Sequence, residues 1–131
     1  MIAFVLVSHS RDVAAGVREM ALQMTGGLVP VIACGGGSDG GLGTDACAIA
    51  DAIRSVARDE GVLVLCDLGS AILSAEQALD FLEDEEKSNV RIADAPFLEG
   101  AVLGAIQASA GSPMREVLET AEGARDLRKL G

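Results

Sequence analysis

The sequence predicts a single α/β domain over residues 1–131, a doubly wound fold with a mainly parallel four-stranded sheet. Four short, continuously apolar segments alternate with segments whose apolar residues recur at helical spacing. Continuous apolarity is typical of parallel strands that are covered on both faces. Right-handed crossovers make 2-1-3-4 the simplest strand order, with about five flanking helices. A chain of 131 residues that is 50% hydrophobic can bury one full core.

The elements follow in order along the chain. The strands are expected at residues 2–7, 29–34, 62–66 and 90–93, with Pro30 weakening the start of the second. Apolar stripes predict helices over residues 13–24, 46–57, 72–82 and 98–110, with a fifth from 113 to about 128. The first stripe counts Met20 and Met24 as core and stops at Gly26-Gly27, and the second ends near Gly61. Residues 83–86 are expected to form a solvated helix end and loop.

Two helix starts carry recognisable capping residues. Thr44 is the expected N-cap of the second helix, after a flexible glycine-rich loop over residues 35–43. Ser112 is expected to cap the fifth helix, with Pro113 as its first residue.

Composition excludes several classes of function. The 20 acidic and 10 basic residues give a net charge of −10, and three residues are aromatic, so nucleic acid and anionic membrane surfaces are poor partners. A single histidine excludes metal sites with two His ligands, and no dedicated metal cluster is expected. Three cysteines without a C-x-x-C motif fit a reducing, cytoplasmic setting. The apolar N-terminal run is too short to span a bilayer.

The polar residues that follow the first and third strands are the candidate site. His9 comes directly after the first strand and Asp67 after the third, and the predicted order makes these strands neighbours at the topological switch point. A carboxylate can accept a hydrogen bond from one ring nitrogen, fix the tautomer and leave the other nitrogen as a nucleophile. The alternatives are a surface-loop histidine and an aspartate that caps the following helix.

Two chemistries fit a His–Asp pair at this position. One is a Ser-His-Asp hydrolase that uses Ser8, Ser10 or Ser70, although a serine next to a histidine in the sequence does not imply the right geometry. The other is a histidine that itself accepts a group covalently, with hydroxyl and N–H donors around a transferred phosphoryl group.

The glycine-rich loop contains a formal G-x-G-x-x-G pattern at Gly35, Gly37 and Gly40. The pattern follows the second strand rather than the first, and Asp39 inside it would repel a pyrophosphate. A flexible loop is the favoured interpretation, and a mobile rim beside His9 that opens for a partner is another.

Four segments resemble a known family. They are residues 5–10, Gly35-Gly36 with residues 42–45, residues 62–76, and Ala95-Pro96 followed by Glu99-Gly100. Together they resemble the DhaM family, the phosphotransferase subunits of phosphoenolpyruvate-dependent dihydroxyacetone kinases. That family is related to the mannose-type EIIA domains of the sugar phosphotransferase system, and the resemblance implies their fold.

The resemblance implies a phosphohistidine at His9 and an orienting carboxylate at Asp67. Phosphate would arrive from the carrier protein HPr and pass to ADP on the DhaL subunit. The ATP formed there would phosphorylate dihydroxyacetone (glycerone) held by DhaK, which is a phosphoenolpyruvate–glycerone phosphotransferase activity. No cofactor is expected on this chain, because ADP, ATP and Mg belong to DhaL, and a homodimer is expected. Contacts with phosphate or partners are predicted for Ser10, Gly36, Thr44, Gly69 and Ser70.

Two alternatives to this function remain open. A mannose-type EIIA component would form the same phosphohistidine and pass the group to a IIB protein. A binding module would sense a nucleotide or metabolite through the glycine-rich loop, with His9 as a contact.

Overall fold

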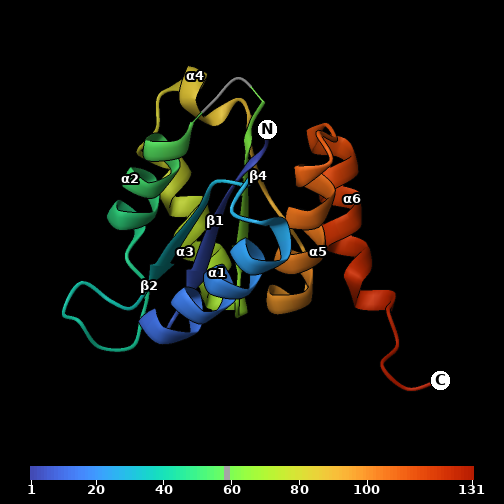
Figure 1. Ribbon diagram of the computed structural model, residues 1–131. Helices are drawn as coiled ribbons and strands as arrows, with labels where there is room; N and C mark the ends of the chain where they lie inside the picture. Colours follow the sequence, from blue (N-terminus) through green and yellow to red (C-terminus); the bar gives the residue numbers. More distant parts are fainter. Residues whose placement is uncertain (58–59) are drawn as a thin grey trace.

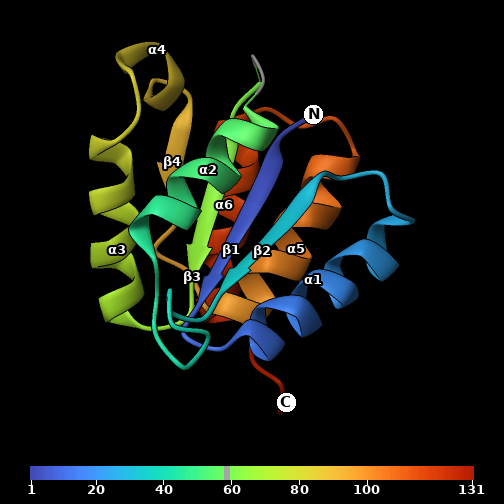
Figure 2. The same ribbon diagram turned by 90° about the vertical axis from the view of Figure 1, so that its left-hand side faces the viewer.

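A computed structural model describes residues 1–57 and 60–131 of the chain. Its strands are β1 (Ala3–Ser8), β2 (Val31–Gly35), β3 (Val62–Cys66) and β4 (Val90–Ile92). They form one parallel sheet of order β2-β1-β3-β4, which confirms the predicted fold class and strand order. Because β1 pairs with both β2 and β3, the carboxyl ends of these three strands lie together (Figure 2).

Helices cover both faces of the sheet (Figures 1 and 2). The helices are α1 (Arg11–Thr25), α2 (Ala46–Val56), α3 (Gly69–Asp80), α4 (Asp84–Lys87), α5 (Phe97–Ser109) and α6 (Met114–Gly123), followed by a 3₁₀ turn (Ala124–Asp126). One apolar cluster joins the sheet to α2 and α3, and a second joins its other face to α1, α5 and α6. Within the described ranges the chain therefore has six α-helices rather than about five.

The second core cluster is built from one large ring and many small side chains. Phe4 is the largest fully buried side chain, and α5 presents buried glycines and alanines to it. A Cβ added at Gly104 would lie 3.2 Å from the Phe4 ring. Small residues thus let α5 approach the Phe4 ring and the sheet closely.

The first helix buries only part of the predicted apolar stripe, since Val17 and Ala21 are buried as expected. Met20 and Met24, expected in the core, are 50% and 59% exposed. The buried positions are Ala14, Val17, Ala21 and Thr25. The buried stripe shares two residues with the predicted one, and its small side chains permit closer packing against the sheet than the two methionines would.

Several element boundaries also differ from the predictions. The second strand begins at Val31 rather than residue 29, since Pro30 has no N–H to donate to a ladder. Asp45, not Thr44, caps α2 by accepting from the N–H groups of Cys47 and Ala48. The third helix begins three residues earlier than its apolar stripe, at Gly69.

The last third of the chain shows similar differences. Pro113 rather than Ser112 is the N-cap of α6, which ends at Gly123 instead of continuing to about residue 128. Residues 84–87 form the short helix α4, and a capping box between Glu83 and Glu86 stabilises its N-terminal end. The predicted continuation of the second helix toward Gly61 crosses residues 58–59, which lie outside the described residues. None of the described helices is both long and apolar enough to cross a membrane.

Candidate functional site

The ends of two adjacent strands bring His9 and Asp67 together. His9 follows the last residue of β1, and Asp67 follows the last residue of β3. The N–H of Asp67 donates to the carbonyl of Val7 at 3.0 Å, which extends the strand pairing by one residue. The sequence therefore placed both residues correctly, because the strand order fixes which loops are neighbours.

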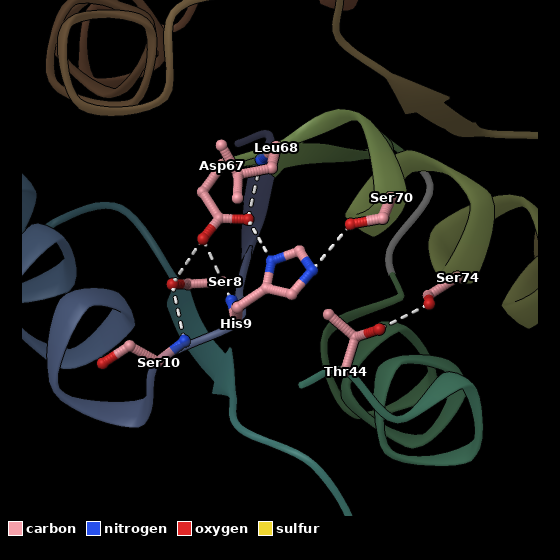
Figure 3. Close-up of polar contacts among 8 residues, drawn as sticks. All are labelled: Ser8, His9, Ser10, Thr44, Asp67, Leu68, Ser70 and Ser74. Carbon is pink, nitrogen blue, oxygen red and sulfur yellow. Dashed lines mark hydrogen bonds and ion pairs between the residues drawn. The ribbon is translucent and has the colours of Figure 1, made fainter. Parts of the chain in front are cut away.

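The carboxylate of Asp67 binds one nitrogen of the His9 ring (Figure 3). The distance from His9 Nδ1 to Asp67 Oδ1 is 2.9 Å. Oδ1 also accepts from the main-chain N–H of Leu68 at 2.7 Å. Oδ2 accepts from the main-chain N–H of His9 at 3.0 Å and from the Ser8 hydroxyl at 2.9 Å. Four donors thus fix the orientation of one carboxylate.

These contacts keep Asp67 ionised. Burial raises the pKa of its carboxyl group, but the hydrogen bonds from His9, Ser8 and Leu68 outweigh burial and hold the pKa below the usual 3.8. An ionised carboxylate only accepts hydrogen bonds, so the proton between the two groups belongs to Nδ1 of His9. In the neutral ring the lone pair then lies on Nε2.

The Nε2 side of the ring faces the start of α3. The Ser70 hydroxyl lies 2.7 Å from Nε2, and it is the donor because Nε2 carries the lone pair. Ser70 is exposed, and the His9 side chain is 26% exposed. Leu68, the N-cap residue of α3, makes no side-chain cap hydrogen bond in the described structure. The N-terminus of α3 therefore offers a positive dipole end near Nε2.

The glycine-rich loop closes another side of the site. The N–H of Gly43 donates to the His9 carbonyl at 2.9 Å, and the N–H of Gly36 donates to the Ser8 carbonyl at 3.2 Å. A Cβ added at Gly35 would lie 2.5 Å from the Ser10 carbonyl oxygen. Only glycine permits this approach of β2 to the start of α1, and the run of glycines directly after an apolar strand was the sequence signal for it.

The remaining predicted residues lie around this centre. Ser10 is the N-cap of α1, where its hydroxyl accepts from the N–H of Val13 at 3.2 Å. The Thr44 hydroxyl lies 2.5 Å from that of Ser74, so Thr44 joins the loop to α3 rather than contacting His9 (Figure 3). Gly69 is the first residue of α3, next to Ser70.

Ser8 was expected only as one of three candidate nucleophiles of a hydrolase, and its contact with Asp67 was not predicted. Its hydroxyl lies inside the site, bound to Asp67 and to the main-chain N–H of Ser10. A serine that ends an otherwise apolar buried strand was the available signal, since a buried hydroxyl needs partners.

Known proteins share this sequence and this fold. The family model described as "PTS system fructose IIA component" matches residues 3–119. A phosphoryl donor subunit DhaM of a PEP-dependent dihydroxyacetone kinase from Listeria innocua is 46% identical over 118 residues, which cover 90% of this chain and 94% of that protein. The DhaM subunit of Escherichia coli is 39% identical over 132 residues, 98% of this chain. This chain spans 28% of the Escherichia coli protein's length.

Solved structures agree with the sequence matches. The protein EF1359, described as being of unknown function, has a TM-score of 0.85 and 37% identity, covering 93% of both chains. The phosphotransferase system component EIIA from Streptococcus agalactiae has a TM-score of 0.70 over 98% of this chain and 97% of its own, at 14% identity, and so shares the fold.

The family match includes every element that builds the site. Residues 3–119 run from the first residue of β1 into α6 and contain both His9 and Asp67. The strong identity to the Listeria innocua subunit extends over nearly the whole of both chains. The chain therefore belongs to the EIIA-man family, the PTS system fructose IIA components.

Proposed function

We propose that this chain is the phosphoryl-carrier subunit of a phosphoenolpyruvate-dependent dihydroxyacetone kinase, and that Nε2 of His9 carries the phosphoryl group. One observation carries the proposal: Asp67 binds Nδ1 at 2.9 Å, while Nε2 faces the exposed Ser70 hydroxyl. The names of the DhaM relatives support the kinase assignment.

The first transfer takes place between His9 and a phosphohistidine of the donor protein. The Nε2 lone pair attacks the phosphorus of a phosphohistidine on HPr, and the donor's N–P bond breaks as the Nε2–P bond forms. His9 keeps its proton on Nδ1, so the phosphorylated ring is positive and the ionised Asp67 stabilises it. Ser70 releases Nε2 and donates to a phosphoryl oxygen, and the N-terminus of α3 at Gly69 adds a favourable dipole.

In the second transfer His9 is the phosphoryl donor instead of the acceptor. A β-phosphate oxygen of ADP bound with Mg on DhaL attacks the phosphorus, and the bond to Nε2 breaks with its electron pair returning to the ring. The ATP so formed phosphorylates dihydroxyacetone on DhaK. This subunit works in the cytoplasm as a homodimer without a cofactor of its own. Ser10, Gly36 and Thr44 belong to the rim that HPr and DhaL contact.

A phosphorelay assay tests the proposal. The chain is incubated with phosphoenolpyruvate, enzyme I and HPr, and its intact mass is measured. Wild type should gain one acid-labile phosphoryl group and His9→Ala none, while light scattering should give twice the chain mass of 13.3 kDa. Adding DhaL, ADP and DhaK should discharge the protein and produce dihydroxyacetone phosphate. Phosphorylated His9→Ala would refute the assignment of the carrier residue.

The same assay separates the two alternatives. Discharge to a IIB protein, with none to DhaL and ADP, would identify a mannose-type component. Tight nucleotide binding without phosphorylation would identify a sensing module that uses the glycine-rich loop.

A second candidate function has a specific observation in its favour. Ser70, His9 and Asp67 are joined by hydrogen bonds of 2.7 and 2.9 Å, in the connectivity of a Ser-His-Asp hydrolase. A fluorophosphonate probe would label Ser70 in such an enzyme, and Ser70→Ala would abolish labelling. The family membership favours the carrier, in which Ser70 assists rather than attacks.

A further inference from the structure

Ser8 is a buried hydroxyl between the carboxylate of the site and the start of α1. Its residue exposure is 0%. We propose that Ser8 is a positioning residue for phosphoryl transfer, which holds the Asp67 carboxylate so that Oδ1 faces His9 and ties that carboxylate to the loop that carries His9. The proposal rests on the proposed function of His9 as the phosphoryl carrier.

The direction of each hydrogen bond at Ser8 is fixed by its partner. The main-chain N–H of Ser10 can only donate, and it lies 3.0 Å from the Ser8 oxygen. The ionised Asp67 can only accept, and its Oδ2 lies 2.9 Å from the same oxygen. The single hydroxyl proton of Ser8 therefore points at Asp67, and the chain of donors runs from Ser10 through Ser8 to the carboxylate. Such chains strengthen each member by polarisation.

Ser8 acts through Asp67 rather than on the phosphoryl group. It lies on the Nδ1 side of the ring with Asp67, whereas Ser70 lies on the Nε2 side where transfer takes place (Figure 3). Among the described contacts of the Asp67 carboxylate, two donors are main-chain N–H groups, one is the His9 ring, and one is Ser8. Ser8 is thus the side chain that orients the carboxylate independently of the reacting histidine.

The bond to Ser10 extends this effect to the backbone around His9. Ser10 is the N-cap of α1, and its main-chain N–H precedes the helix. Because Ser8 and Ser10 flank His9, their bond fixes the tight turn on which the imidazole sits. Loss of the Ser8 hydroxyl would leave the Ser10 N–H without this partner and would remove one of four donors from Asp67.

A graded series of variants tests the proposal. Ser8→Thr keeps the hydroxyl, Ser8→Cys keeps a weaker donor of similar size, and Ser8→Ala removes the donor. The matched control is Thr25→Val, which removes a buried hydroxyl at the far end of α1, where it donates to the Ala21 carbonyl. The donor is phosphoramidate, whose P–N bond breaks with release of ammonia as the Nε2–P bond forms, so protein docking does not enter the rate.

The expected rate order is wild type and Ser8→Thr first, then Ser8→Cys, then Ser8→Ala with a loss of roughly tenfold. Thr25→Val should phosphorylate at the wild-type rate. A second readout is the Asp67 pKa, followed by carboxyl ¹³C NMR in the unphosphorylated protein. It should rise in Ser8→Ala, because one donor that favours the charged form is lost, and return in Ser8→Thr. Among the described residues that donate to the Asp67 carboxylate, His9 is the one with an ionisable side chain, so the titration of Asp67 is compared between variants that all retain His9.

The outcomes separate this proposal from the proposed function. If wild type accepts phosphate neither from phosphoramidate nor from HPr, the carrier function fails, while the Asp67 titration still tests the link to Ser8. If wild type is phosphorylated and Ser8→Ala matches it in rate and in the Asp67 pKa, the positioning role is overturned. If Ser8→Ala does not fold, a Ser8→Cys variant with wild-type rate and wild-type Asp67 pKa overturns it equally.

Discussion

The two nitrogens of the His9 ring lie in opposite surroundings. Nδ1 faces a carboxylate that is 17% exposed and accepts four hydrogen bonds, from Ser8 at the end of β1, from the main chain and ring of His9, and from the main chain of Leu68 after β3. Nε2 faces a single exposed hydroxyl at the first turn of α3. We call the Nδ1 side, where Asp67 and its four hydrogen bonds lie, the closed side of the ring. The Nε2 side, where the Ser70 hydroxyl makes one hydrogen bond and can rotate away, is the open side.

This difference teaches how one residue can be both rigid and reactive. The closed side determines the tautomer and supplies the negative charge that a phosphorylated ring requires. The open side leaves the lone pair to a partner, since a serine hydroxyl can turn from Nε2 to a phosphoryl oxygen at little cost. Variants on each side should therefore fail in different ways.

Asp67→Asn should give the largest effect, because it replaces one of the two acceptor oxygens of the carboxylate by an NH₂ group, which can only donate. One carboxylate oxygen accepts from the main-chain N–H of His9 and the other from that of Leu68. In either orientation the amide NH₂ of asparagine would therefore face a main-chain N–H, which is also a donor. We expect phosphoryl transfer to fall by roughly 10²–10⁴-fold, as expected for a misplaced orienting group. The rate of phosphorylation by HPr measures it. Asp94→Asn makes the same change of charge after β4 and should leave the rate unaltered, and an equal loss in both would show that charge alone matters.

Ser70→Ala tests the open side. The hydroxyl donates to the charged phosphoryl group in the proposed mechanism, so the rate should fall by roughly 10–100-fold while the fold is unchanged. Ser109→Ala, at the end of α5 where the hydroxyl donates to the Ile106 carbonyl, is the control and should retain the rate. Complete loss of a hydrolytic activity in Ser70→Ala, with normal phosphorylation by HPr, would instead favour the serine hydrolase.

Gly35→Ala should disturb the backbone at the start of α1, directly after His9. The new Cβ would lie 2.5 Å from the Ser10 oxygen and 2.8 Å from Arg11 Cα, both backbone atoms. We expect a loss of about 1–3 kcal/mol in the free energy of unfolding, measured with urea. Gly16→Ala, in the middle of α1 with nothing within 4 Å of the new Cβ, should raise that free energy by about 0.5–1 kcal/mol. A fully stable Gly35→Ala protein would contradict the close approach.

The stabilising contribution of ionised Asp67 should be lost only at low pH. The pKa of Asp67 lies below the usual 3.8, so its ionised form stabilises the folded state fully above that value. This contribution is lost as the pH falls through the lower pKa of the folded protein. The difference in stability between wild type and Asp67→Asn should shrink as the pH falls below about pH 4. A difference that does not shrink there would mean that the carboxylate is not held as described.

Much of the site followed from local patterns. The apolar segments and the crossover rule located the carboxyl ends of β1 and β3, and with them His9 and Asp67. The predicted helix caps and core residues were less accurate. Asp45 caps α2 where Thr44 was expected, and Met20 is half exposed where a core residue was expected. Neighbouring residues of similar type compete for such positions, and packing chooses between them.

The sequence by itself determined the order of the strands and which loop residues meet at the sheet edge, because periodicity reports local conformation and burial. Only the tertiary structure decided which ring nitrogen is held, and it alone assigned partners to the Ser8 and Ser70 hydroxyls. Those bonds join residues 58 to 61 positions apart, and each depends on atomic positions to within a fraction of an ångström. Such distances arise from the packing of the whole sheet and its helices, which no local pattern contains.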